Sequence, residues 1–161
     1  MGGLMQRVAI FVDVQNIYYT TRQSFNRNFN YNAFWAQTTS GREIVAATAY
    51  AIDKGDEKQR QFQNILRAIG FEVKLKPFIQ RNDGSAKGDW DVGITLDVME
   101  YAPQSDVVVL ASGDGDFDLL LNKMRMDYDV SAEVYGVRQL TAQSLINSAT
   151  TFIAITDDLL L

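Results

Sequence analysis

Two long apolar runs in this chain each end on aspartate, and this arrangement limits the folds available to it. The first run covers residues 8–12 and is followed by Asp13. The second covers residues 107–111 and is followed by a turn that holds Asp114 and Asp116. Strands that are apolar throughout are typical of parallel sheets covered on both faces. Both strand ends are therefore expected at the carboxyl edge of such a sheet, where α/β proteins bind their ligands.

The rest of the chain alternates between strand-like and helix-like patterns. Strands are predicted at about 7–14, 43–52, 71–78, 106–111 and 130–135, with a short one near 151–155. Helices are predicted at roughly 16–26, 31–39, 56–69, 89–102, 115–127 and 141–149. This alternation predicts an α/β protein with a central, mainly parallel sheet between two layers of helices.

The length of 161 residues suits one domain with a single substantial core. We expect residues 1–6 to be a disordered or cloning-derived start and residues 7–161 to be the domain. The start lacks the pattern of a signal peptide, and no apolar run approaches the roughly 18 residues of a membrane span. These features predict a cytoplasmic protein without a membrane partner.

The absence of two residue types restricts the chemistry of any site. The chain has no cysteine, which excludes disulfides and thiolate catalysis. It also has no histidine, which excludes every mechanism that uses a histidine base. With neither residue present, oxygen atoms must supply the ligands of any bound metal.

The net charge of −5 argues at first against a nucleic-acid partner. Seven of the 20 acidic residues belong to the candidate site or flank it, and without them 13 acids face 15 lysines and arginines, a balance of +2. The seven are Asp13, Asp89, Asp91, Asp97, Asp114, Asp116 and Asp118. Bound divalent ions would offset part of this local charge, so phosphate substrates stay compatible with the composition.

The acids of the predicted helix 89–102 form a third cluster. Asp91 and Asp97 are six residues apart, roughly 600° of helical rotation, so they lie about 120° apart around the helix. We expect Asp91 to point into the site and Asp97 to be either a supporting residue or a buried structural acid. Helix capping is the alternative explanation for Asp13 and for Asp114, because aspartate favours helix starts.

Several other side chains are candidates for contacts with a substrate. Lys87 and Arg81 are candidates for holding a phosphate, and a solvated loop position is the alternative for Lys87. Further phosphate-binding candidates on the same edge, each with an ordinary surface charge as its alternative, are Arg22, Arg27 and Arg138. The candidates for stacking on nucleic-acid bases are Tyr18, Tyr19 and Trp90.

Three ordered segments, at residues 12–16, 87–92 with Asp97, and 112–117, together resemble the NYN domain. The similarity is to its LabA-like bacterial branch, within the PIN-like nuclease superfamily. It runs from Val8 to about Ile155, and residues 149–153 resemble the closing segment of the family.

This resemblance implies a Rossmann-like α/β/α domain with the sheet order 3-2-1-4-5. It also implies a ribonuclease site at the carboxyl edge that depends on Mg²⁺ or Mn²⁺. The acidic ligands carried over from the family are Asp13, Asp91, Asp114 and Asp116, with Asn16 as their polar companion. Asp97 corresponds to a further acid common in this branch.

The leading hypothesis is hydrolysis of RNA, in which Asn16 and Ser112 orient ligands or water and Lys87 or Arg81 steadies the scissile phosphate. The alternative is a non-catalytic regulatory module that binds RNA or a protein partner. A dehalogenase-type phosphatase is disfavoured, because Gln15 occupies the place of its second aspartate. The apolar tail 159–161 can dock on its own domain or on a second copy, which leaves a homodimer open.

Overall fold

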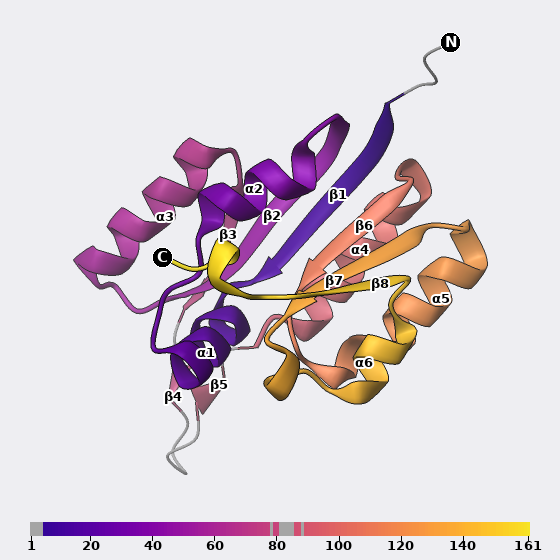
Figure 1. The fold of residues 1–161 in the computed structure, drawn as a ribbon. Coiled ribbons are helices and arrows are strands. Elements are labelled where there is room, and N and C mark those ends of the chain that lie inside the picture. Colours follow the sequence, from indigo (N-terminus) through magenta and orange to yellow (C-terminus); the bar gives the residue numbers. More distant parts are fainter. Residues whose placement is uncertain (1–4, 78, 81–85, 88) are drawn as a thin grey trace.

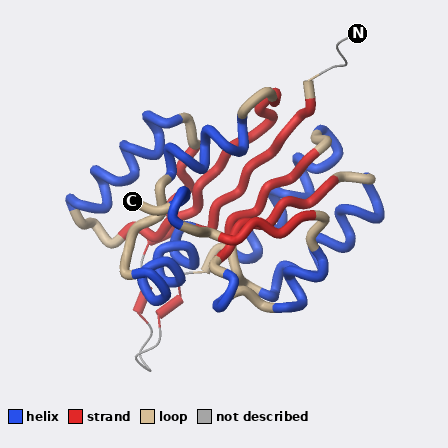
Figure 2. The backbone as a smooth tube through the Cα atoms, viewed as in Figure 1, coloured by secondary structure: helices blue, strands red, loops and turns tan. Residues whose placement is uncertain are grey.

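A computed structural model describes residues 5–77, 79–80, 86–87 and 89–161. These residues form three layers, a central sheet between two layers of helices (Figures 1 and 2). Residues 1–4 of the expected N-terminal start lie outside this description, and the first strand begins at Gln6. The fold is the predicted α/β/α arrangement.

The sheet has six strands, all parallel, in the order β3-β2-β1-β6-β7-β8. The strands are β1 (Gln6–Asp13), β2 (Arg42–Asp53), β3 (Glu72–Pro77), β6 (Val107–Ala111), β7 (Ser131–Gly136) and β8 (Thr151–Ala154). The predicted order 3-2-1-4-5 is confirmed, and the short strand expected near 151–155 adds a sixth position at the edge. Two short strands outside this sheet pair antiparallel with each other, β4 (Ile79–Gln80) and β5 (Ala86–Lys87).

Three helices cover each face of the sheet. One face carries α1 (Val14–Phe25), α2 (Tyr31–Thr39) and α3 (Glu57–Ile69), and the other carries α4 (Asp91–Tyr101), α5 (Asp118–Tyr128) and α6 (Gln143–Ser148). Successive residues of a strand point to opposite faces, and β1 shows the result. Its Ile10 and Val12 belong to the core under α1–α3, while Phe11 belongs to the core under α4–α6.

Strands are added to the sheet in opposite directions on the two sides of the β1–β6 pair. From β1 the chain adds β2 and β3 on one side, and from β6 it adds β7 and β8 on the other. Val12 pairs with Ala111 in the register, so these two neighbouring strands end at the same level. This is the position at which doubly wound sheets open a crevice for ligands.

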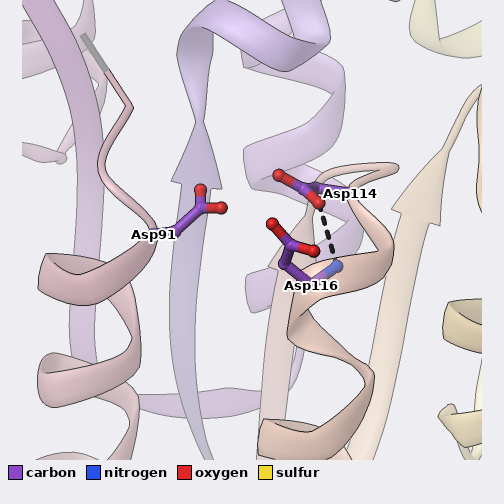
Figure 3. Close-up of side chains that lie close together, drawn as sticks. All are labelled: Asp91, Asp114 and Asp116. Atoms are coloured by element: carbon purple, nitrogen blue, oxygen red, sulfur yellow. Dashed lines mark hydrogen bonds between the residues drawn. The ribbon is translucent and has the colours of Figure 1, made fainter. Parts of the chain in front are cut away.

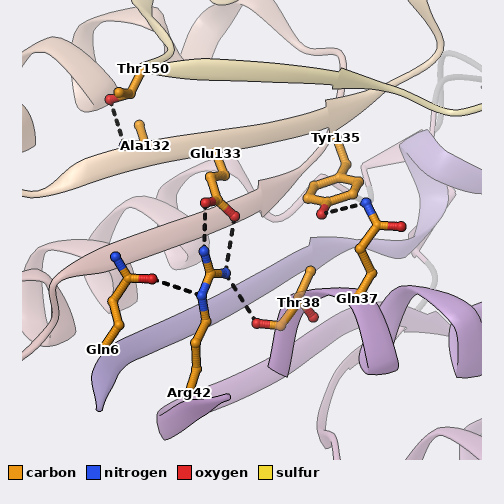
Figure 4. A network of polar contacts seen from close by, with 8 residues as sticks. All are labelled: Gln6, Gln37, Thr38, Arg42, Ala132, Glu133, Tyr135 and Thr150. Atoms are coloured by element: carbon orange, nitrogen blue, oxygen red, sulfur yellow. Dashed lines mark hydrogen bonds and ion pairs between the residues drawn. The ribbon is translucent and has the colours of Figure 1, made fainter. Parts of the chain in front are cut away.

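A closed polar network lies nearer the amino ends of the strands (Figure 4). The Arg42 guanidinium donates two hydrogen bonds to the Glu133 carboxylate, at 3.1 and 2.7 Å, and one to the Thr38 carbonyl at 3.1 Å. A further bond at 2.9 Å reaches the side-chain oxygen of Gln6. The two charged side chains are only 18% and 20% exposed, and each meets an opposite charge.

The C-terminal tail packs on its own domain. Leu159 and Leu160 are 2% and 5% exposed within the core beside α2, while Leu161 is 69% exposed. No helix in the described ranges has the length and hydropathy that a membrane span requires.

Candidate metal centre

The centre begins at the adjoining ends of β1 and β6. Asp13 is the last residue of β1 and caps α1, its carboxylate accepting the Asn16 backbone N–H at 3.4 Å. The same carboxylate accepts the Ser112 hydroxyl at 3.2 Å, so a hydrogen bond joins the two strand ends. Asp13 is 9% exposed and Ser112 is fully buried. Asp13 therefore does cap α1, as considered above, and the cap holds its carboxylate where β1 and β6 end side by side.

The turn after β6 is held in place from several sides. The Asn16 side-chain oxygen accepts the Gly113 N–H at 2.9 Å, and the Ser112 hydroxyl oxygen accepts the Asp114 N–H at 3.2 Å. Gly113 also lies against the chain at 140–141, where an added Cβ would come within 2.9 Å of the Leu140 carbonyl oxygen. A residue larger than glycine would therefore push the turn away from its neighbours.

Three carboxylates converge in front of this turn (Figure 3). Asp114 accepts the Asp116 backbone N–H at 2.9 Å at the start of the 3₁₀ turn Gly115–Phe117, and Asp91 approaches from the first residue of α4. One oxygen from each of the three lies within 4.8 Å of the others. We call Asp91, Asp114 and Asp116 the acidic trio; the first two are half-buried and the third is exposed. Asp13 is not a member of the trio; its carboxylate accepts the Ser112 hydroxyl, and its charge contributes to the raised pKa of Asp91.

Burial and like charge both raise the affinity of these acids for protons. Burial is the largest cause for Asp91 and raises its pKa to about 7, with further contributions from the charge of Asp114, a hydrogen bond with Asp114, and the charges of Asp89 and Asp13. Burial also raises the pKa of Asp13 to about 6, although two hydrogen bonds to its carboxylate oppose the shift. Crowding that disfavours the charged form is what a bound cation would relieve.

The residue before Asp91 anchors it to the sheet. Trp90 donates its indole N–H to the Ala51 carbonyl at 2.9 Å, and its ring packs on Tyr50 with centroids 5.3 Å apart. The Lys76 ammonium lies 4.6 Å from the centre of the same ring. Trp90 is therefore a packing residue that fixes the start of α4, and the stacking role considered for it has no support from this geometry.

Asp97 lies outside the acidic trio. Its carboxylate accepts the Tyr50 hydroxyl at 2.6 Å and the Lys74 ammonium at 2.7 Å, and its side chain is 16% exposed. Of the two roles expected for it, the contacts are those of a structural acid that joins α4 to β2 and β3. The pKa of Lys74 is raised, and its hydrogen bond to Asp97 is the largest cause. Lys74 was not singled out from the sequence, where the one available signal was its inward position in a short strand.

The predicted substrate cations differ in what the structure says of them. Arg81 lies outside the described residues, as does the side chain of Lys87. Arg27 is engaged by Asp157 at 2.8 Å, and Arg138 lies 5.0 Å from the Phe152 ring centre. Arg22 is exposed and has no hydrogen bond or ion pair from its side chain to the rest of the described chain.

The acidic trio fits a hard divalent cation. It offers only carboxylate oxygens, which suit Mg²⁺ and Mn²⁺, and the chain has no histidine or cysteine to favour softer metals. Within the described ranges no lysine or arginine forms an ion pair with any of its members. Among the described residues, the trio is thus a set of ligands without a counter-charge.

Comparison with known proteins agrees with this fold. The NYN domain matches residues 7–156, and the chain belongs to this family, part of the PIN-like nuclease superfamily. A relative in Synechococcus elongatus, the low amplitude and bright protein LabA, is 28% identical over 94% of this chain and 84% of its own length. The crystal structure of a protein of unknown function from Vibrio parahaemolyticus is 56% identical, covers 100% of this chain and 99% of its own, and superposes with a TM-score of 0.95.

Proposed function

We propose that this protein is a ribonuclease that hydrolyses RNA phosphodiester bonds with Mg²⁺ or Mn²⁺ held by the acidic trio. The observation that carries the proposal is the convergence of Asp91, Asp114 and Asp116, with no ion pair to a described lysine or arginine, at the carboxyl edge of a fold from a nuclease superfamily. Like charges at this distance repel, and their repulsion costs free energy that only a ligand would recover.

The surrounding residues keep the trio in position. Asn16 and Ser112 bind the backbone of the turn that contains Asp114. Trp90, the residue before Asp91, is held by its hydrogen bond to the Ala51 carbonyl. The Asp13 carboxylate accepts the Ser112 hydroxyl, and its negative charge contributes to the raised pKa of Asp91. A bound divalent ion would supply positive charge for the phosphate oxygens and lower the pKa of a water in the site.

The test is RNA cleavage by purified protein with and without Asp114→Asn. We expect wild-type protein to cut a labelled single-stranded RNA in Mn²⁺ but not in EDTA, and the substitution to lower the rate by at least about 100-fold. Asp118→Asn is the matched control, because Asp118 starts α5 one turn away and is not part of the trio. It should cleave like wild type.

Two outcomes would refute the proposal. If Asp114→Asn cleaved as fast as wild type, the activity would not come from this centre. If wild-type protein bound RNA but cleaved none in Mg²⁺ or Mn²⁺, the regulatory alternative would replace the nuclease.

A further inference from the structure

A concave site lies on the face of the sheet that carries α1, α2 and α3. It is a cavity of about 690 Å³ between α1, the end of β2 and the start of α3. Its wall includes Val14 and Gln15, which directly follow Asp13 in the chain. The cavity thus begins at the residues that follow Asp13 at the carboxyl end of β1. Its volume falls within the range of small-ligand sites.

Two buried polar side chains in the wall of this cavity lack a partner. Gln63 is 5% exposed and Tyr31 is 8% exposed, and neither forms a side-chain hydrogen bond within the described part of the chain. Polar groups that are this deeply placed are almost always hydrogen-bonded to protein, water or a ligand.

The small exposed fractions of Gln63 and Tyr31 face the cavity that both residues line. Among the described residues, every side-chain nitrogen or oxygen that is wholly inaccessible has a hydrogen-bond partner. The Gln63 amide and the Tyr31 hydroxyl are therefore not sealed in the core, and the cavity that both line gives them contact with whatever fills it. An amide offers two donors and an acceptor, and a phenol offers one of each.

The other walls favour a planar and anionic ligand. Tyr18 is 54% exposed at the cavity, and Phe62 provides a second aromatic surface. Arg22 and Lys58 stand exposed in the wall, and the Asp56 carboxylate is occupied by the Lys58 backbone N–H at 2.8 Å. Aromatic faces stack on nucleobases, amides hydrogen-bond base edges, and arginine binds phosphate.

We propose that this cavity binds one nucleotide. Its base hydrogen-bonds Gln63 and Tyr31 and stacks on an aromatic wall, and its phosphate meets Arg22 or Lys58. The two possible sources are a free nucleotide and one unit of an RNA strand. The RNA source rests on the proposed nuclease function, because the strand would then continue across the turn from β1 to α1 to the acidic trio.

The decisive variant is Gln63→Met, which keeps the size of the side chain and removes its amide. The matched control is Gln61→Met, the same change on the exposed face of the same helix. The probes are a short fluorescein-labelled single-stranded RNA, followed by anisotropy, and the four ribonucleoside 5′-monophosphates as competitors. All measurements are made in EDTA, so that they do not depend on metal or cleavage.

We expect Gln63→Met to weaken binding of the probe about tenfold, while Gln61→Met binds like wild type. The melting temperature of Gln63→Met should be close to or above that of wild type, since the substitution removes no hydrogen bond within the described part of the chain. Tyr31→Phe should weaken binding in the same way. Displacement of the RNA by a monophosphate supports the RNA source, and binding of a monophosphate without RNA binding supports the free-nucleotide source.

Three results would overturn the nucleotide site. One is unchanged binding by both Gln63→Met and Tyr31→Phe, and another is binding of neither probe by wild-type protein. The third is a lower melting temperature of Gln63→Met with unchanged affinity, which would show that the amide serves the fold. None of these results depends on whether Asp114→Asn abolishes cleavage, so the two proposals fail separately.

Discussion

Two polar clusters on one sheet follow opposite rules of charge. Near the amino ends of the strands, Arg42 and Glu133 neutralise each other through two hydrogen bonds in a half-buried position. At the carboxyl edge, the acidic trio gathers three like charges with no ion pair to any described lysine or arginine. Helix α4 contains both patterns, because Asp97 is paired with Lys74 while Asp91 is not. The paired clusters join neighbouring elements of the fold, whereas the trio gathers like charge without an ion pair among the described residues.

The largest effect is expected from breaking the paired cluster. Glu133→Gln would leave the half-buried Arg42 without its counter-charge and lower the free energy of unfolding by about 2 kcal/mol. Urea denaturation measures this value. The control is Asp127→Asn, which breaks the ion pair with Lys123, whose side chain is 65% exposed, and should cost less than about 0.5 kcal/mol. If both variants lost the same free energy of unfolding, the half-buried pair would be no more important to stability than the exposed one.

Removing a charge from the acidic trio is expected to raise the free energy of unfolding rather than lower it. Asp91→Asn removes one of three repelling charges, so in EDTA at about pH 8 it should raise the free energy of unfolding by on the order of 1 kcal/mol, a value discounted for solvent screening. The raised pKa fixes the pH dependence, because folded Asp91 releases its proton near about 7 rather than near 3.8. The metal-free protein therefore loses stability as pH rises through this window. Destabilisation by Asp91→Asn in EDTA would show that the charge is needed for folding.

The smallest effect is expected in the pH dependence of metal binding. Protons compete with Mn²⁺ for Asp91, so the affinity of the acidic trio for Mn²⁺ should fall about twofold between about pH 8 and about pH 7. Titration calorimetry at the two pH values measures this change. The slope should be flatter in Asp91→Asn, in which the group that titrates near about 7 is gone. An equal slope in both proteins would place the competing proton elsewhere.

The sequence predicts the sheet well because each signal acts locally. Buried parallel strands appear as continuous apolar runs, and the aspartates that end them mark the carboxyl edge. Asp114 and Asp116 lie in one turn, so their proximity needs no knowledge of the fold. The helical rotation between Asp91 and Asp97 also predicts that they diverge, as they do.

The partners of these residues depend on tertiary contacts and could not be predicted. Lys74 is 23 residues from Asp97 in the chain, and only the pairing of β2 with β3 brings it under α4. Gln63 looks like an ordinary polar residue of an amphipathic helix, and its burial without a partner becomes visible only with the neighbouring elements in place. Arg27 was a candidate for phosphate, yet it binds Asp157, 130 residues further along the chain.

The indole anchor of Trp90 has a consequence for how this family can diversify. Because Trp90 is tied to the Ala51 carbonyl and held under Lys76, the start of α4 takes its position from β2 and β3 rather than from the chain just before it. A change of length or composition in the chain just before Asp89 is therefore expected to leave the carboxylate of Asp91 in place beside Asp114 and Asp116.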